Sequence, residues 1–362
     1  MKEQIFIAQE NFDKKQFQDF ILVGDIGGTN CRLGVIGKSS SYQLIFSFNY
    51  ESKQLNHIYH AINETLKEAK SRYDVEIKDC CLALAGPVLP KRDFCQFTNL
   101  SWNVDAKEIL SNTFLQSVSL INDFEAIGYG IPLMKNDQLI LLQHPNSSPS
   151  SQQKATKAII GAGTGLGKAI LTFNEQKQNY VPVASEGGHA DFPITEEIEQ
   201  ELVRWWKRQN NTEKHPDYEV FLSGPGLFTI YSFLRSIHFD KGNRYTQEID
   251  VAEDKPSVIS EHVTNDRTCK KAMGMFLHIY SKAARNFALE TVSRGGIYLA
   301  GGIAPKIIQF ITNSKFMEEF ENNIAMKQLL EQIPVFVVTE ENIGLFGAAN
   351  VSLNFKELSI KK

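Results

Sequence analysis

The sequence predicts an α/β protein made of two related halves around one cleft. The chain has 362 residues, which corresponds to about two domains at roughly 150 residues each. A short apolar strand that runs into glycines recurs near residues 25, 161 and 301. Stretches with helical spacing of apolar residues lie between these points. The three strand–glycine units are unevenly spaced, which excludes a solenoid repeat.

The first half has the pattern of a sheet with helices packed against it. Apolar runs predict strands at 20–23, 32–36, 43–48, 80–85 and 118–121. Helical spacing predicts helices at 57–69 and 124–130, and Asp105 is expected to cap a short helix. Because a strand follows the glycines at 27–28, the opening is predicted to be a β-hairpin. Residues 1–19 carry charges of both signs and are expected to be a polar extension before the domain.

The second half begins after a loop rich in Ser, Gln and Pro at 143–157. Strands are expected at 158–160, 168–173, 297–300 and 334–339. Helices are expected at 198–206, 227–234, 273–292 and 342–353. The polar stretch at 240–256 is expected to be an exposed loop.

Composition excludes several classes of protein. Hydrophobic residues make up 42% and charged residues 22%, as in folded globular proteins, and the net charge of -4 lacks the positive field of a nucleic-acid binder. The five cysteines show no Cys-x-x-Cys spacing, which argues against a structural zinc or a disulfide framework. No apolar run approaches the roughly 20 residues that span a bilayer. We therefore expect a cytoplasmic protein that binds neither nucleic acid nor membrane.

Two glycine-rich turns have the composition of phosphate-binding loops: Asp25-Ile-Gly-Gly-Thr-Asn30 and Gly161-Ala-Gly-Thr-Gly-Leu-Gly167. Glycines let the backbone approach a phosphate closely, and amides and Thr hydroxyls donate to its oxygens. Asp25, at a strand end, can hold a magnesium ion through waters. Neither loop is a Walker A motif, and neither precedes a helix as a Rossmann fingerprint does. A plain turn is the alternative for both.

Asp123 is a candidate general base, because it follows a predicted strand at the sheet edge where ligands bind. Taken alone, a helix cap supplied by Asn122 or Asp123 is the better-supported role. Gly301 and Gly302 end another strand and open an expected helix. They can contact a nucleotide or form a simple turn.

Glu186 and His189 flank two glycines, with Asp191 close behind. Such groups can hold a polyhydroxylated ligand through paired donors and acceptors, and a metal site is the rival role. Glu219 precedes a helix and can reach the same cleft, although a surface position is the simpler alternative.

In this order, the motifs resemble those of the bacterial-type glucokinases, within the superfamily of sugar kinases, actin and heat-shock chaperone ATPases. The resemblance runs from about residue 20 to the last helix, on residues 23–30 with Arg32, 98–99 with Trp102, 121–124, 161–167, 186–192, 222–227 and 300–305. It implies a two-lobed sugar-kinase fold, related to ribonuclease H, with a cleft between a smaller and a larger α/β domain. The expected domains are a small one at 20–133 plus 341–362 and a large one at 134–340.

The resemblance also implies ATP-dependent phosphorylation of glucose to glucose 6-phosphate by a cytoplasmic homodimer. Asp123 would be the general base, and the residues that hold the sugar would be Asn122, Asp123, Glu186, His189 and Glu219. ATP would be bound by Gly27, Gly28, Thr29, Asn30, Gly163, Thr164, Gly165, Gly301 and Gly302, and Mg²⁺ would be linked to Asp25 through water.

Two alternatives remain open at this stage. Another hexose can be the acceptor, because the orientation of one hydroxyl is not visible in a sequence. A non-catalytic sugar sensor is less favoured, since the N-terminal segment has no room for a helix-turn-helix and Asp123 is present. A chaperone-type ATPase or filament protein would give Glu186, His189 and Glu219 no reason to accompany Asp123.

Overall fold

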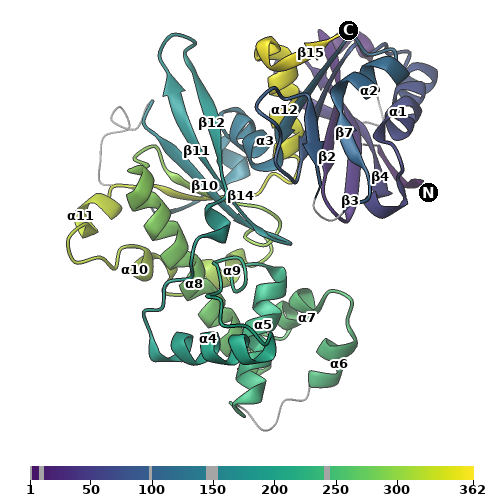
Figure 1. Cartoon of the computed structure of the whole chain (residues 1–362). Coiled ribbons are helices and arrows are strands. Elements are labelled where there is room, and N and C mark those ends of the chain that lie inside the picture. The colour runs from purple at the N-terminus through teal and green to yellow at the C-terminus, as the bar shows by residue number, and fades with distance from the viewer. Residues whose placement is uncertain (1, 8–11, 98–99, 144–153, 240–244) are drawn as a thin grey trace. The chain divides into compact units, whose positions relative to one another are not determined.

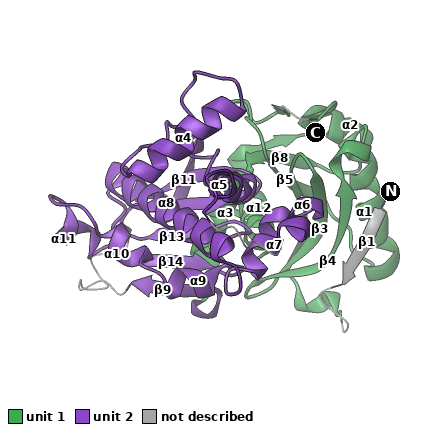
Figure 2. Ribbon diagram, turned by 90° about the horizontal axis from the view of Figure 1, so that it is seen from below, with its two compact units in different colours: residues 1–135, 340–362 green, residues 136–339 purple. Residues whose placement is uncertain are grey.

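The structure is a computed structural model that describes residues 2–7, 12–97, 100–143, 154–239 and 245–362 (Figure 1). The chain divides into two compact units, residues 1–135 with 340–362 and residues 136–339 (Figure 2). Each unit has a mixed β-sheet with helices against it, which confirms the predicted α/β class. The motif at 98–99 and residues 144–153 of the Ser-rich loop lie outside the described residues.

The first unit is built on a sheet with the strand order β1-β4-β3-β2-β5-β8-β15. Its strands are β1 (Lys2–Ile7), β2 (Asp19–Ile26), β3 (Asn30–Lys38), β4 (Tyr42–Glu51), β5 (Asp79–Leu84), β8 (Ser117–Asn122) and β15 (Ser359–Lys361). Strands β2, β5 and β8 are parallel, and the other neighbours are antiparallel. The predicted β2–β3 hairpin is confirmed. A small ladder joins β6 (Phe94–Gln96) to β7 (Asn103–Asp105).

Helices cover both faces of this sheet (Figure 1). They are α1 (Ile58–Tyr73), α2 (Ala106–Asn112), α3 (Asp123–Gly130) and α12 (Ile343–Asn354). Successive residues of β2 point to opposite faces, so Leu22 joins a core cluster with Ile58 of α1, whereas Val23 joins a cluster with Ala348 of α12. Burial on both faces explains why β2 is a continuous apolar run rather than an alternating one.

Helices α3 and α12 touch backbone to backbone, which only glycine permits. A Cβ on Gly347 would lie 1.7 Å from the carbonyl oxygen of Ala126, and one on Gly130 would lie 2.5 Å from that of Ile343. A real Cβ stays more than 3 Å from such an oxygen, so a side chain at either glycine would push the helices apart. This crossing fixes the position of α3, whose first residue is Asp123.

The second unit repeats the strand pattern of the first. Its sheet has the order β12-β11-β10-β13-β14-β9, with β9 (Leu139–Gln143), β10 (Lys157–Ala162), β11 (Leu166–Asn174), β12 (Asn179–Ser185), β13 (Ile297–Ala300) and β14 (Val335–Val338). Strands β10, β13 and β14 are parallel, and antiparallel strands flank them on both sides. The same arrangement in β4-β3-β2-β5-β8-β15 confirms the prediction of two related halves.

The helices of the second unit include α8, the long helix predicted at 273–292. They are α4 (Glu197–Gln209), α5 (Gly224–Ser236), α6 (Thr246–Val251), α7 (Lys255–Glu261), α8 (Arg267–Thr291), α9 (Ile308–Thr312), α10 (Phe316–Phe320) and α11 (Lys327–Leu330). Side chains of α8 such as Phe276 and Tyr280 are buried in one core cluster with strand and helix residues. None of the helices in the described part of the chain is long and apolar enough to cross a membrane.

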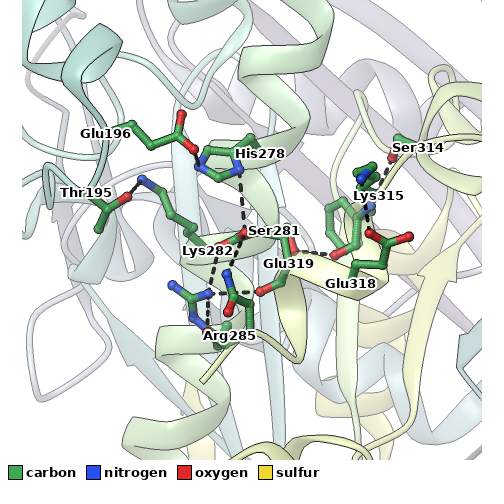
Figure 3. A network of polar contacts seen from close by, with 12 residues as sticks. Thr195, Glu196, His278, Ser281, Lys282, Arg285, Ser314, Lys315, Glu318 and Glu319 are labelled. Carbon is green, nitrogen blue, oxygen red and sulfur yellow. Dashed lines mark hydrogen bonds and ion pairs between the residues drawn. The ribbon is translucent and has the colours of Figure 1, made fainter. Parts of the chain in front are cut away.

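A buried ion pair joins Lys282 of α8 to Glu199 of α4. The ammonium of Lys282 contacts Glu199 Oε1 and also donates to Thr195 Oγ1 at 2.8 Å (Figure 3). The side chains of Lys282 and Glu199 are 1% and 2% exposed. Glu199 Oε2 accepts from the backbone N–H of Thr195 at 2.8 Å and of Glu196 at 3.1 Å. Paired charges are tolerated in such a place because every polar atom has a partner.

The amino-terminal residues and the polar stretch at 240–256 differ from the predictions. Strand β1 pairs with β4, so residues 2–7 extend the sheet instead of lying outside it. Phe17 is buried, and its ring packs against Gly37. A Cβ on Gly37 would lie only 2.5 Å from Cδ1 of this ring. The second stretch contains α6 and the start of α7, and Ile249 is fully buried.

Candidate active site

The first glycine turn joins β2 to β3. Gly27 donates its N–H to the carbonyl of Asn30 at 2.8 Å and accepts from Ser52 Oγ at 2.7 Å, and the N–H of Ser52 donates to the carbonyl of Thr29 at 2.9 Å. These bonds fix the turn, whereas the side chains of Thr29 and Asn30 are exposed and Gly28 is half-buried. The turn therefore presents backbone and hydroxyl groups from a rigid support.

Asp25 lies in β2 directly opposite Arg32 of β3. Desolvation by surrounding protein atoms raises the pKa of Asp25, and the guanidinium of Arg32 opposes that rise. The Asp25 side chain is nevertheless accessible to solvent. Accessibility and the nearby positive charge both favour the ionised carboxylate that a hydrated magnesium ion requires.

Asn122 and Asp123 stand where β8 passes into α3. Asn122 is the N-cap, and its Oδ1 accepts from the N–H groups of Phe124 at 2.9 Å and Glu125 at 3.3 Å. Glu125 completes a capping box by accepting from the N–H of Asn122 at 3.1 Å, and Arg92 holds its carboxylate with two bonds of 2.9 Å. Asn122 thus takes the capping role, while the half-buried Asp123 is fixed as the first helical residue.

Three segments of the second unit converge on the other sugar-site candidates. They are the glycine loop between β10 and β11, the short 3₁₀ turn at 187–189 and the chain at 217–219. The N–H of Glu219 donates to the carbonyl of Gly188 at 3.1 Å, and Glu219 Oε2 accepts from the N–H of Leu166 at 2.8 Å. A Cβ on Gly188 would lie 2.0 Å from the carbonyl oxygen of Leu166. The structure thus brings Glu219 to both turns.

His189 is held by Asp217, a residue that the sequence interpretation missed. His189 Nδ1 lies 2.9 Å from Asp217 Oδ2, and Asp217 Oδ1 accepts from the N–H of Val220 at 3.1 Å. The bond to Asp217 raises the pKa of His189, and the charges of Glu219 and Glu186 add to the rise. With Nδ1 on the carboxylate, the ring presents Nε2 to a ligand. Only the proximity of Asp217 to Glu219 in the sequence hinted at this role.

We expect His189 to titrate above the usual histidine pKa of 6.5, because Asp217 stabilises the imidazolium. A proton NMR titration should show this rise in the wild type and a lower pKa in Asp217→Asn, with the other histidines unchanged. The stabilisation that protonated His189 gives the fold is complete below the unfolded pKa and is lost as pH rises through the raised value. A wild-type pKa at or below 6.5 would contradict the assignment.

Lys168 is a second residue that the sequence interpretation missed. It follows the glycine loop, is 3% exposed, and places its ammonium 4.8 Å from the ring centre of Tyr218 and 5.1 Å from that of Phe287. Burial lowers its pKa, and Glu290 partly offsets this. The aliphatic part of the Lys168 side chain lies against Gly187, and a Cβ on Gly187 would be 3.1 Å from Lys168 Cδ. Lys168 therefore supports the turn at 187–189 from beneath.

Gly301 and Gly302 lie next to the glycine loop, at the carboxyl ends of the parallel strands β13 and β10. Gly301 has φ 80°, and a Cβ there would lie 2.8 Å from the carbonyl oxygen of Ala162. The two glycines start a series of turns, and α9 begins only at Ile308, so the expected helix does not open at them. A Cβ on Gly302 or Gly163 would meet nothing within 4 Å.

The candidate residues therefore form two groups, one on each unit. Asp25, the first turn, Asn122 and Asp123 lie at one sheet edge of the first unit, where β2, β5 and β8 end. The second group contains the glycine loop, Glu186, His189, Glu219 and the turn at 301–302. Among the described residues, no three His, Cys, Asp or Glu side chains are arranged to hold a metal ion, so Glu186, His189 and Asp191 form no such cluster.

Comparisons with known proteins extend over nearly the whole chain. A sequence model of the glucokinase family matches residues 22–354. A glucokinase of Nostoc sp. is 34% identical over 344 residues, which cover 91% of this chain and 97% of that protein. The crystal structure of a glucokinase from an Antarctic psychrotroph has a TM-score of 0.75 at 27% identity and covers 93% of this chain and 99% of that chain.

A more distant structure shares the fold. It is a ROK family glucokinase from Streptomyces griseus in complex with glucose and AMPPNP, with a TM-score of 0.65 at 17% identity, covering 92% of this chain and 99% of that chain. The two mixed sheets, and the order in which the glycine turns follow one another along the chain, agree with this similarity to glucokinases. The chain belongs to the glucokinase family.

Proposed function

We propose that this chain transfers the terminal phosphoryl group of ATP to the 6-hydroxyl of glucose. The observation that carries the proposal is the packing of Glu186, His189 and Glu219 around a glycine loop in one unit, in a chain that matches the family over residues 22–354. Hydroxyl-rich ligands are bound by such paired acceptors and donors. Glycine loops at strand ends suit phosphates.

Glucose is held by groups from both sets of residues. The carboxylates of Glu186 and Glu219 accept from sugar hydroxyls, and His189 offers Nε2 because Asp217 occupies Nδ1. Asn122 uses its side-chain oxygen to cap α3, so its amide nitrogen is the atom that donates to the sugar. These contacts orient the 6-hydroxyl, which is the main requirement of phosphoryl transfer.

Asp123 is the proposed general base that takes the proton from the 6-hydroxyl. The capping box and the Arg92–Glu125 pair prevent the start of α3 from fraying. The crossing with α12 prevents the helix from sliding. A base that is fixed in this way loses little entropy when the reacting groups align.

ATP is proposed to lie against Gly27 to Asn30, Gly163 to Gly165, and Gly301 with Gly302. The exposed carboxylate of Asp25 fits a magnesium ion that is held mainly by water and phosphate oxygens, since such a site needs only one or two protein carboxylates. Bound there, magnesium would neutralise phosphate charge.

We further propose that the two units correspond to the small and large domains of the kinase fold, with boundaries near 133 and 341. A cytoplasmic homodimer is proposed from the resemblance to the bacterial-type glucokinases. Sedimentation analysis of the purified chain tests the dimer, since a single monomer species at micromolar concentration would refute it.

A coupled assay with Mg-ATP and a panel of hexoses tests the proposed acceptor. We expect rapid phosphorylation of glucose and weak activity on mannose, fructose and N-acetylglucosamine. Higher activity on another sugar would keep the kinase chemistry and replace the acceptor. Sugar binding without transfer would favour the sensor alternative.

A further inference from the structure

Glu219 is bonded to the glycine loop as well as placed for the sugar. Its Oε2 accepts from the N–H of Leu166 at 2.8 Å, where the loop passes into β11. Its main chain is also fixed, because its N–H donates to Gly188 and its carbonyl accepts from Ser223 Oγ at 2.8 Å. Oε2 therefore accepts a hydrogen bond from the loop, which leaves Oε1 as the oxygen that would bind the sugar.

Gly165 lies directly against this carboxylate. A Cβ on Gly165 would be 2.5 Å from Glu219 Oε2, 3.1 Å from Cδ and 3.6 Å from Oε1, and these three are its nearest atoms. Positive φ occurs at Gly296 and Gly301 but not at Gly165, so alanine would not strain the backbone there. Gly163 differs, because a Cβ there would meet nothing within 4 Å. The requirement for glycine at 165 therefore comes from Glu219.

We propose that Gly165 serves the acceptor site, by leaving room for the Glu219 carboxylate to bind the sugar and the Leu166 N–H together. The proposal rests on the proposed function and changes the role of Gly165, which the sequence assigned to the nucleotide. Glu219 is then a shared positioning residue. Sugar on Oε1 holds the carboxylate in place, and the carboxylate holds the start of β11 through Oε2.

The consequence is that a methyl group in the glycine loop weakens sugar binding. The obstacle to alanine is the far end of a flexible side chain, so Glu219 can swing away while the fold is kept. Swinging away breaks the bond to Leu166 and removes a charged acceptor from the sugar. The loss of one charge-assisted hydrogen bond corresponds to roughly 10- to 100-fold weaker binding.

Calorimetric titration with glucose in the absence of nucleotide tests this. Gly165→Ala should raise the glucose dissociation constant roughly 10- to 100-fold, and thermal melting should confirm that the variant is folded. Gly163→Ala is the matched control on the same loop. Its effect is expected on ATP binding, and its glucose dissociation constant should stay within about twofold of the wild type.

A rescue experiment separates the shared carboxylate from general damage to the loop. Glu219→Asp shortens the side chain by one methylene and makes room for the methyl group that Gly165→Ala adds. The glucose dissociation constant of the double variant Gly165→Ala/Glu219→Asp should therefore be no higher than the larger of the values for Gly165→Ala and Glu219→Asp alone. The proposal would be overturned if the losses of glucose affinity in the two single variants added up in the double variant, or if Gly165→Ala bound glucose as tightly as the wild type. Either result would leave the proposed function, glucose phosphorylation, unaffected. A wild-type chain that does not bind glucose would overturn the proposed function and this inference with it.

Discussion

Replacing Asp123 by alanine is expected to lower the turnover number with glucose by roughly 10²-fold or more, the usual effect of losing a general base. ATP binding should be kept, because the glycine turns do not depend on this side chain. Asn122 and Glu125 cap α3 in the variant as before, so its thermal stability should stay close to that of the wild type. Steady-state kinetics and a melting curve measure both effects.

Asp105→Ala provides the matched control in the same unit. Asp105 also precedes a helix, and its Oδ1 accepts from the N–H of Lys107 at 2.7 Å and of Glu108 at 3.3 Å. Its loss should cost about 1 kcal/mol of stability and leave turnover unchanged. Turnover near the wild-type value in Asp123→Ala would show that Asp123 is not the base.

Glu199→Ala is expected to destabilise the second unit by about 3–5 kcal/mol, because it leaves the Lys282 ammonium buried and without its carboxylate. The melting temperature should fall by roughly 10 °C. The pair joins α4 to α8, and α4 begins at Glu197, shortly after the turn at 187–189 that is proposed to bind the sugar. Glucose binding should therefore weaken in step with stability.

The stabilisation by the Glu199–Lys282 pair should also depend on pH, in a direction that follows from the pKa of Glu199. Burial on its own would raise the pKa of Glu199, but bonds from Lys282 and from the N–H groups of Thr195 and Glu196 bring it below its usual 4.5. Its stabilisation is therefore present above 4.5 and lost as pH falls through the lower folded pKa. The difference in stability between wild type and Glu199→Ala should narrow in that acidic range.

Two further variants control for the loss of a side chain. Glu201→Ala removes an exposed carboxylate from the same helix and should change stability by no more than about 0.5 kcal/mol. The double variant Glu199→Leu/Lys282→Met should recover most of the loss, since an apolar pair of similar volume needs no charge partner. A single variant as stable as the wild type would show that the pair is not fully desolvated.

Local patterns were sufficient where the chain alone decides the structure. The β2–β3 hairpin and strand β13 follow from apolar runs bounded by glycines, and β13 has the predicted bounds of 297–300. The amino-terminal strand was missed because an edge strand is held by backbone pairing with β4 and needs no alternating pattern. Helix α6 was missed because Ile249 is the buried residue that anchors a short and mostly polar segment.

The candidate site was predictable in its residue types but not in its connections. Asn122 and Glu186 could be singled out because polar groups next to strand ends and glycines are visible in a sequence. The bond of Asp217 to His189 and the contact of Gly165 with Glu219 join segments 28 and 54 residues apart. Such contacts come from packing between turns, which no local pattern encodes.

The central claim is that this chain transfers a phosphoryl group from ATP to glucose. The most direct test is to measure the stoichiometry of the reaction by phosphorus NMR, with the purified chain, glucose and Mg-ATP. The account predicts that ADP and glucose 6-phosphate appear in equal amounts until one substrate is exhausted. ATP that persists unchanged in the presence of glucose, or ADP and inorganic phosphate without a sugar phosphate, would contradict it.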